Sequence, residues 1–533
     1  MTRKLGKKKA RLALALLLVP VALLTNRVTA SASDPVEVRT DAGVLRGEVS
    51  GEARVFNGVP YAAPPVKDLR WKAPQPVKPW TGVRDAKQYR SACPQQDNPE
   101  APGGSTTEDC LYLNVTTPVK QSAKPRPVVV WIPGGGFFMG AGSNYGANEM
   151  ATRGDAVVVT INYRLGIFGF FGYPGLSGSG TYGIQDQQAA LRWVQRNARS
   201  FGGDPRNVTV AGESAGGMSV CAQMTSPTAT GLFSKAIMQS GSCAFSWADN
   251  SQYPGQAGDS FWVPESRVRQ TGAEWAAATK DKLKCTPGQA MLDCLRAADP
   301  AVLTAETLQF TQVAYGGTAT LPLSPAKAMK AGLFHRVPVL SGNNHDEATP
   351  WVAAFNGGKI SDADYPRMVK DMVGAKQAAA VLREYPLKNY KSAAEAWAAV
   401  TTDRIWSCTQ VANDLQAARK VPVYAYEFAD TNSPLAQPGQ GAAHAMELPY
   451  LFSLGGAELP MTPAQQRLSE QMIDYWTTFA RTGNPNGPDR PHWAPVKHGD
   501  VNGLSLAPAD QDGGIKPVNL STEHHCGLWS KVR

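Results

Sequence analysis

The sequence predicts an α/β fold built around a large, mainly parallel sheet with helices on both faces. Four apolar runs rich in Val and Ile are each followed by a Gly-rich turn and a helix-like stretch, and their apolarity is continuous rather than alternating. Continuous apolarity is typical of strands buried on both faces. The 533 residues are enough for one large layered sheet or for two domains. The four runs are residues 128–132, 156–161, 208–210 and 337–340.

The rest of the chain extends this pattern without a repeat or a linker. Residues 235–239 and 423–428 are predicted to be further strands. A long helix is predicted to begin at Thr462-Pro463 and to end before Gly483, because Thr caps helices well, Pro suits the first helical position and Gly ends helices. Residues 245–330 mix Gly, Pro and short helical pieces, so we expect an insertion over one end of the sheet.

Composition and charge exclude several classes of protein. Hydrophobic residues make up 43% of the chain and charged residues 18%, which is typical of a globular protein and not of a disordered one. The formal charge is +9, but seven basic residues and no acidic ones fall within residues 1–32. Without them, 46 basic residues face 44 acidic ones. The charge therefore gives no support for a nucleic-acid partner.

Residues 1–32 are predicted to be a cleaved secretory signal peptide, which leaves residues 33–533 as one domain. A basic start is followed by an apolar run at residues 12–24 and by the small residues Ala30-Ser31-Ala32. A membrane anchor is the alternative, but 13 apolar residues fall short of the ~20 that cross a bilayer, and no later segment is long enough. We therefore expect a secreted protein without a membrane span.

The eight cysteines all lie in the predicted mature chain. An even number of cysteines in an oxidising compartment indicates disulfides, although the count does not give the pairing. Metal binding is a weak alternative, because the sequence has no C-x-x-C or H-E-x-x-H motif and its seven histidines are scattered. We expect neither a metal nor an organic cofactor. The cysteines are Cys93, Cys110, Cys221, Cys243, Cys285, Cys294, Cys408 and Cys526.

Ser214 is the candidate nucleophile. It lies in Gly212-Glu213-Ser214-Ala215-Gly216, a G-x-S-x-G motif that directly follows the strand at 208–210 and opens a helix-like run. In this setting the glycines allow a turn so sharp that the Ser hydroxyl projects above the sheet, and the helix start offers N–H groups to an anion. The pattern alone recurs by chance, and the flanking strand and helix give it meaning.

A nucleophilic serine needs a base and an orienting acid, expected in the chain order Ser, acid, His. His444 lies in a Gly-rich loop soon after the strand at 423–428, which is where catalytic loops belong. Asp346 and Glu347 both follow the strand at 337–340, and residue chemistry alone does not choose between them. The other histidines far enough downstream are His524 and His525, together with His492 and His498 in a Pro-rich polar region that favours solvent exposure.

A Gly-rich segment is the candidate oxyanion hole. Pro133-Gly134-Gly135-Gly136-Phe137 follows the strand ending at Ile132. Glycines let backbone N–H groups approach a developing oxyanion, and each such donor contributes about 2.7–4 kcal/mol in comparable sites. A flexible turn is the plain alternative. A phosphate loop is disfavoured, because neither G-x-G-x-x-G nor a following Lys-Ser/Thr is present.

In this order of elements, the mature chain resembles the type-B carboxylesterases, a family of the α/β-hydrolase fold that includes cholinesterases, carboxylesterases and some lipases. Two long motifs carry the resemblance, at residues 201–216 and 108–115. Three segments support it, at residues 57–62, 162–166 and 186–194.

The resemblance implies a role for each candidate. It makes Ser214 the nucleophile, His444 the base and Glu347, rather than Asp346, the acid. It gives the oxyanion donors as the N–H groups of Gly135, Gly136 and Ala215, with ion pairs Arg70–Glu108 and Arg164–Asp186. Pro133 departs from the His or Tyr that the family usually has there, and we expect little loss from it.

The resemblance also implies disulfides and a substrate pocket. It pairs Cys93 with Cys110, Cys285 with Cys294, and Cys408 with Cys526, and leaves Cys221 and Cys243 as either a fourth bridge or two buried thiols. Phe137, Phe245 and Trp247 are expected at the substrate pocket, although core packing is the alternative for Phe245 and Trp247. The loop at residues 94–109 lacks the Trp that binds choline in cholinesterases.

The predicted function is that of a secreted serine carboxylesterase acting on uncharged esters of short to medium acyl chains. The partner is a small ester, and the oligomeric state stays open. A secreted lipase acting on insoluble esters is the alternative among enzymes. A non-catalytic adhesion member of the family is disfavoured, because Ser, Glu, His and the three glycines are all retained.

Overall fold

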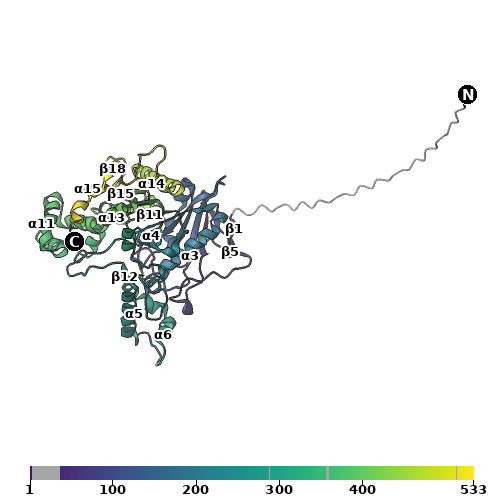
Figure 1. Ribbon diagram of the computed structural model, residues 1–533, viewed down its shortest axis with the longest axis horizontal. Coiled ribbons are helices and arrows are strands. Elements are labelled where there is room, and N and C mark those ends of the chain that lie inside the picture. The colour runs from purple at the N-terminus through teal and green to yellow at the C-terminus, as the bar shows by residue number, and fades with distance from the viewer. Residues whose placement is uncertain (3–35, 287, 356–358, 498, 512, 533) are drawn as a thin grey trace. The chain divides into compact units, whose positions relative to one another are not determined.

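A sheet of 11 strands runs through the part of the chain that this computed structural model describes, which is residues 1–2, 36–286, 288–355, 359–497, 499–511 and 513–532 (Figure 1). The predicted signal peptide falls on residues 3–35, outside the described residues, and stays a prediction. Every neighbouring pair from β17 to β9 in the sheet is parallel, and the strands at both edges are antiparallel. In sheet order the strands are β18 (Lys516–Asn519), β17 (Asn502–Leu506), β15 (Val423–Phe428), β14 (Val339–Asn344), β11 (Lys235–Gln239), β10 (Gly203–Glu213), β7 (Arg126–Ile132), β9 (Val157–Ile161), β6 (Tyr112–Pro118), β4 (Ala53–Pro60) and β3 (Glu48–Ser50).

Helices cover both faces of the sheet, which confirms the predicted α/β class. Along β7 the side chains alternate between two apolar clusters: Val128 and Val130 pack in one, and Val129 and Trp131 in the other. The first cluster includes α3 and α4, and the second includes α14. The helices are α1 (Asn148–Gly154), α2 (Gly166–Phe170), α3 (Tyr182–Asn197), α4 (Ala215–Thr225), α5 (Glu265–Thr279), α6 (Met291–Ala297), α7 (Pro300–Thr304), α8 (Pro325–Ala331), α9 (Thr349–Phe355), α10 (Tyr365–Val373), α11 (Ala375–Glu384), α12 (Ala393–Thr401), α13 (Cys408–Ala418), α14 (Pro463–Thr482), α15 (Leu520–Glu523) and α16 (Cys526–Trp529).

Smaller elements complete the described fold. In Figure 1, α5 and α6 of the insertion extend away from the main sheet. The short strands outside the main sheet are β1 (Glu37–Arg39), β2 (Val44–Arg46) and β5 (Val83–Asp85) in one group, β12 (Trp262–Pro264) with β13 (Val313–Tyr315), and β8 (Tyr145–Gly146) with β16 (Ser453–Leu454).

Helix α14 begins and ends where its sequence predicts. The Thr462 hydroxyl accepts the N–H of Gln465, and the Gln465 side chain accepts the N–H of Thr462, so the two form a capping box with Pro463 at the first position. Gly483 ends the helix with φ 78°, a left-handed conformation that favours glycine.

Several predicted strands differ in extent, and β14 bears most directly on the site. It begins at Val339 rather than Val337 and continues through Asn344, so the polar stretch after Leu340 belongs to the sheet. Buried partners make this possible, because the Ser341 hydroxyl donates to Asp414 and the Asn344 amide donates to Glu447. Apolarity therefore marked only the first part of the strand.

Disulfides join all eight cysteines. The structure contains the three pairs that the resemblance implied, Cys93–Cys110, Cys285–Cys294 and Cys408–Cys526. It also joins Cys221 to Cys243, the pair that the sequence left open. The fourth bridge ties α4, which follows Ser214, to the segment after β11.

Loss of the Cys408–Cys526 bridge is expected to lower the free energy of unfolding by about 4–5 kcal/mol, because it closes a loop of 118 residues in the unfolded chain. The matched control removes Cys285–Cys294, whose separation is 9 residues and whose expected contribution is about 2–3 kcal/mol. Urea unfolding of the two Cys→Ser double variants measures both values. Equal losses would contradict the loop-length argument, and free thiols at Cys408 and Cys526 in the purified protein would contradict the bridge itself.

Candidate active site

Ser214 lies on the sharp turn between β10 and α4, with φ 56° and ψ −123°. A non-Gly residue rarely adopts this conformation, and such strain persists only where the surroundings hold it, often at functional sites. The N–H of Ser214 donates to the carbonyl of Gln239 at 2.9 Å. A Cβ on Gly216 would lie 2.0 Å from the carbonyl oxygen of Ile132, so the turn needs glycine there. The turn presents a half-buried serine at the carboxyl edge of the parallel strands.

The Gly-rich segment after β7 lies directly against this turn. A Cβ on Gly134 would lie 2.8 Å from a carboxylate oxygen of Glu213 and 3.2 Å from Cβ of Ser214. Gly135 and Gly136 have φ of 92° and 58°, and no hydrogen bond among the described residues uses their N–H groups. Ala215 is the first residue of α4, so its N–H has no acceptor within the helix. Gly134 thus places the start of the segment that carries two of the predicted oxyanion donors beside Ser214, and the third predicted donor, Ala215, follows Ser214 directly.

His444 and Glu347 come from two different loops and meet beside the turn. His444 Nδ1 lies 2.6 Å from Glu347 Oε2, and the Glu347 carboxylate is fully buried. The backbone N–H of Asn344 donates to the other carboxylate oxygen at 2.9 Å. An acid held at Nδ1 in this way fixes the imidazole ring with Nε2 available to a proton.

Asp346 and Glu347 are adjacent in the sequence but contact different partners. Asp346 contacts His345 Nδ1 at 2.9 Å and accepts the N–H of Ala442 at 2.9 Å, and it has no contact with the His444 ring. Burial raises the pKa of Asp346, but the hydrogen bond and charge of His345, the N–H of Ala442 and the charge of His524 together outweigh burial and lower that pKa below its usual value. Asp346 therefore joins the two loops that carry Glu347 and His444, and of these two acids only Glu347 contacts His444.

A second carboxylate lies on the other side of the imidazole. Glu213 Oε1 is 3.1 Å from His444 Nε2, and no hydrogen bond joins Ser214 to His444 in the described part of the chain. Burial raises the pKa of Glu213 well above its usual value. Burial lowers the pKa of His444, but the carboxylates of Glu213 and Glu347 outweigh it and raise that pKa to about 9. Glu213 and His444 therefore act as one coupled pair.

A third buried glutamate, Glu447, joins the His444 loop to the ends of two strands. Glu447 accepts hydrogen bonds from the side chains of Asn344 at 2.8 Å and Gln239 at 2.9 Å. Burial raises the pKa of Glu447. Because Asn344 ends β14 and Gln239 ends β11, these bonds tie the His444 loop to the strand ends beside Ser214.

An aromatic wall of Trp351, Trp406, Phe245 and Trp247 lies beside the His444 ring. Trp351 of α9 and Trp406 have ring centroids 4.8 Å and 4.6 Å from that of His444. Phe245 lies 4.4 Å from Trp406 and 5.1 Å from Trp247, so two predicted pocket residues belong to this wall. No local pattern in the sequence predicted Trp351 or Trp406 at this site, because neither lies in a motif.

Phe137 packs against the aromatic wall indirectly, through Phe261. It is fully buried, and its ring centroid lies 5.6 Å from Phe261, which in turn lies 5.8 Å from Phe245. Trp247 is the predicted pocket residue that keeps partial exposure. Phe137 therefore reaches the wall through Phe261, and its place at the substrate pocket stays a prediction.

The loop between Cys93 and Cys110 has no aromatic residue, but it carries the carboxylate of Glu100. The Glu100 carboxylate accepts a hydrogen bond from Asn144 at 3.2 Å, and burial raises its pKa. Nearby, the carbonyl of Pro133 accepts the hydroxyl of Tyr163 at 3.1 Å. Although Pro133 replaces the His or Tyr that is usual in the family, this hydrogen bond still anchors the start of the Gly-rich segment.

The other candidate histidines lie elsewhere. His492 is exposed, and His498 lies outside the described residues. His524 is buried between Asp403 and Glu427. Among the described residues no group of three or more His, Cys, Asp and Glu side chains is arranged to hold a metal ion. None of the helices in that part of the chain has the length and apolarity that a membrane crossing requires.

The two ion pairs expected from the resemblance are also present. Arg70 Nε lies 2.7 Å from Glu108, and Arg164 Nε lies 2.7 Å from Asp186, all with buried side chains. Each pair joins two segments of the chain, 38 and 22 residues apart in the sequence.

Comparison with known proteins decides the family. The sequence model described as "Carboxylesterase family" matches residues 34–529. The chain belongs to the carboxylesterase family. It is therefore a carboxylic ester hydrolase of the α/β-hydrolase fold, as the motifs predicted.

Named relatives place this carboxylesterase among esterases. It is 35% identical over 474 residues to para-nitrobenzyl esterase of Bacillus subtilis (strain 168), which covers 84% of this chain and 90% of that protein. It is 35% identical over 499 residues to acetylcholinesterase of Bungarus fasciatus, covering 85% and 79%. A solved structure titled PNB esterase matches with a TM-score of 0.75 at 31% identity, covering 93% of this chain and 100% of that one.

Replacing Glu213 with Gln is expected to shift the pH dependence of this carboxylesterase. A base must be neutral to accept a proton, so activity rises as pH passes the pKa of His444. The Glu213 carboxylate stabilises the imidazolium and helps raise that pKa to about 9. Without it, the rising limb of kcat/KM should move to lower pH by about 1–3 units. If the rising limb of kcat/KM stays at the same pH in Glu213→Gln, Glu213 does not carry a negative charge beside His444.

Proposed function

We propose that this carboxylesterase is secreted and hydrolyses uncharged esters of short to medium acyl chains, with Ser214 as nucleophile, His444 as base and Glu347 as the acid that orients it. The observation that carries the proposal is the pairing of His444 Nδ1 with the buried Glu347 at 2.6 Å, beside a serine on a strained turn that is flanked by free backbone N–H groups.

The mechanism follows from these positions. Ser214 Oγ attacks the ester carbonyl carbon while its proton passes to His444 Nε2, and the carbonyl oxygen becomes an oxyanion that the N–H groups of Gly135, Gly136 and Ala215 stabilise. The C–O bond to the alcohol then breaks, and the imidazolium returns the proton to the leaving oxygen. Water attacks the acyl-enzyme by the same route and regenerates Ser214.

Glu213 must release Nε2 during this cycle. Its carboxylate lies 3.1 Å from Nε2, where the Ser214 hydroxyl has to donate. When Glu213 holds the shared proton, the imidazole is neutral and its Nε2 lone pair can accept from Ser214. The coupled pair thus sets how much of the enzyme carries a competent base at a given pH.

The proposed substrate range rests on the walls of the site. The aromatic wall beside His444 offers apolar contacts to an acyl chain but limits its length, because Phe245, Trp247 and Trp406 pack against one another. On the alcohol side, residues 94–109 hold no aromatic ring on which a quaternary ammonium could rest. This favours uncharged alcohols, such as the one in the name of the para-nitrobenzyl esterase relative.

Secretion is proposed from two features. The leader has the composition of a signal peptide. Four disulfides join the eight cysteines of the mature chain, and such bonds persist in oxidising compartments.

A series of esters tests the proposal. We expect kcat/KM to be greatest for butanoyl to octanoyl p-nitrophenyl esters and to fall toward palmitoyl. Acetylthiocholine should show no advantage over its uncharged 3,3-dimethylbutyl isostere. A tenfold choline advantage would reveal a cation site, and a jump in rate above substrate solubility would identify a lipase instead. The absence of hydrolysis of every ester would overturn the proposed mechanism.

A further inference from the structure

Trp406 connects the acyl wall to the catalytic base. It lies in η7 (Thr402–Ser407), a π-helical turn between α12 and α13. Its ring centroid is 4.6 Å from that of His444 and 4.4 Å from that of Phe245. π-helical turns are rare and occur often at functional sites. The position of η7 therefore sets the width of the aromatic wall, because it places Trp406 against Phe245. It also places Trp406 against one face of the His444 ring.

Two tethers bracket Trp406 along the chain. Three residues before it, Asp403 Oδ1 lies 2.6 Å from His524 Nδ1. Two residues after it, Cys408 is bonded to Cys526. Both tethers lead to the same short stretch of the C-terminal segment, residues 524–526. This segment is far from every catalytic motif in the sequence, yet it holds both ends of the turn that carries Trp406.

The first tether is a buried ionic contact. His524 also donates from Nε2 to Glu427 of β15 at 2.8 Å, so the ring bridges η7 and the central sheet. Burial lowers the pKa of His524, but Asp403 and Glu427 outweigh it and raise that pKa to about 10. The ring is therefore a cation between two carboxylates at neutral pH. Removing one member of such a buried cluster leaves an uncompensated charge, so its geometry is tightly held.

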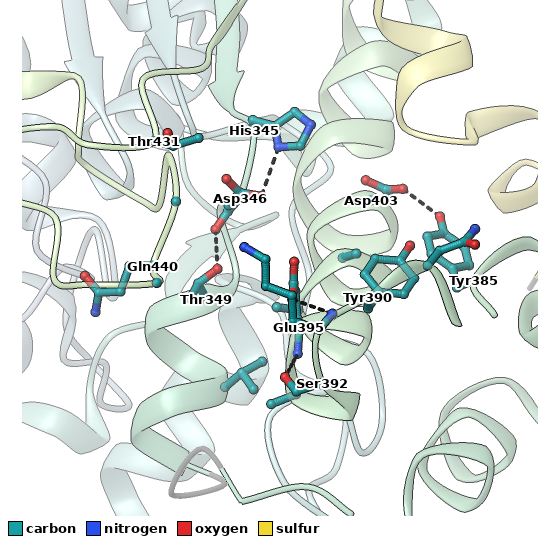
Figure 2. Close-up of a pocket in the computed structure, with 18 of the residues that line it drawn as sticks. His345, Asp346, Thr349, Tyr385, Tyr390, Ser392, Glu395, Asp403, Thr431 and Gln440 are labelled. Atoms are coloured by element: carbon teal, nitrogen blue, oxygen red, sulfur yellow. Dashed lines mark hydrogen bonds and ion pairs between the residues drawn. The ribbon is translucent and has the colours of Figure 1, made fainter. Parts of the chain in front are cut away.

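One side of η7 borders a cavity, which Asp403 reaches. A cavity of about 880 Å³ is lined by Asp403, Tyr385 and residues of α12, together with His345 and Asp346 from the turn after β14. Figure 2 shows Asp403 and Tyr385 joined at one wall of this cavity, with Asp346 on the opposite side. On this side the contacts of Asp403 are polar: it accepts the hydroxyl of Tyr385 and pairs with His524. These contacts and the bridge to Cys526 restrain the turn in addition to its packing.

We propose that His524 is a positioning residue for acyl selectivity, because it holds Asp403 and thereby the turn that places Trp406 in the acyl wall. The proposal rests on the proposed function, since it assigns the aromatic wall to the acyl group. It predicts that loosening His524 widens the wall and favours longer acyl chains without touching the substrate.

The test is a double-variant cycle on acyl selectivity, measured as the ratio of kcat/KM for octanoyl and butanoyl p-nitrophenyl esters. His524→Gln removes the cation, and we expect the ratio to rise about fivefold. Trp406→Ala should raise the ratio directly. In the Trp406→Ala background, His524→Gln should add no further change, because the side chain through which it acts is gone.

The control is His525→Gln, at the adjacent residue, whose ring contacts Glu384 at 2.8 Å and is partly exposed. It should leave the ratio unchanged. If His524→Gln does not fold, Asp403→Asn removes the negative charge from the same contact with an isosteric side chain, which weakens the tether and is expected to raise the ratio likewise. A lower thermal stability with an unchanged ratio would overturn the proposal, as would an equal shift in the Trp406→Ala background. Failure of the proposed function is a separate result, because it would appear as ester hydrolysis that survives Ser214→Ala.

Discussion

Replacing Ser214 with Ala is expected to lower kcat for ester hydrolysis about 10⁶-fold, as loss of a nucleophilic serine does in comparable enzymes. The hydroxyl is the one proposed covalent nucleophile, and no hydrogen bond of its side chain is present among the described residues, so its removal costs the fold little. Alanine also relieves none of the backbone strain at φ 56°. Initial rates with p-nitrophenyl butanoate, together with the thermal unfolding midpoint, measure both effects.

The matched control for this variant is Ser246→Ala, an exposed serine next to Trp247. It should keep full activity. Activity retained in Ser214→Ala, or lost equally in Ser246→Ala, would contradict the assignment of the nucleophile.

Replacing Glu347 with Gln is expected to lower kcat about 10⁴-fold, the effect of the corresponding change in a serine protease. The carboxylate 2.6 Å from Nδ1 fixes the tautomer of His444 and offsets the charge of the imidazolium. An amide at this position can donate to Nδ1 and so favours the wrong tautomer. Steady-state kinetics in Glu347→Gln, with circular dichroism to check the fold, measure the loss.

The neighbouring acid provides the control. In Asp346→Asn the side-chain oxygen can still accept the N–H of Ala442, so the contact between the two loops survives and the loss should be far smaller. Equal losses in the two variants would show that the acid has been placed one residue too far along the chain.

Local sequence signals predicted the parts of the site that depend on local geometry. The motif at Ser214 and the glycines after β7 need only a strand, a tight turn and a helix start, and the structure has these elements. The choice between Asp346 and Glu347 needed the family resemblance, because their separation depends on how β14 ends. That strand continues through Asn344 by burying polar side chains against distant partners, which no local pattern reveals.

Other parts of the site depend on contacts between distant segments and gave no signal. Trp351 and Trp406 come from α9 and η7, and they meet only where both pack on His444. Glu213 was visible within the motif at Ser214, but its contact with Nε2 required the position of a loop more than 200 residues away. The Cys221–Cys243 bridge stayed open for the same reason, since either residue could have been a buried thiol.

The fold was more predictable than the site, because central strands that are buried on both faces of the sheet contain continuous apolar runs. The continuous apolar runs of β7, β9 and β15 identified central strands, and the capping residues of α14 identified its ends. The antiparallel edge strands carry weaker patterns and were not assigned. Their role is to extend the sheet, and the site lies away from them at the carboxyl ends of the parallel strands.

Covalent labelling with an organophosphate, such as diethyl p-nitrophenyl phosphate, tests the central claim most directly. The phosphorus should be attacked by the activated serine, so activity should fall in proportion to the label, with one label per chain. Peptide mapping should then place that label on Ser214, and Ser214→Ala should take up none. Complete inactivation with the label on any other residue would contradict the account.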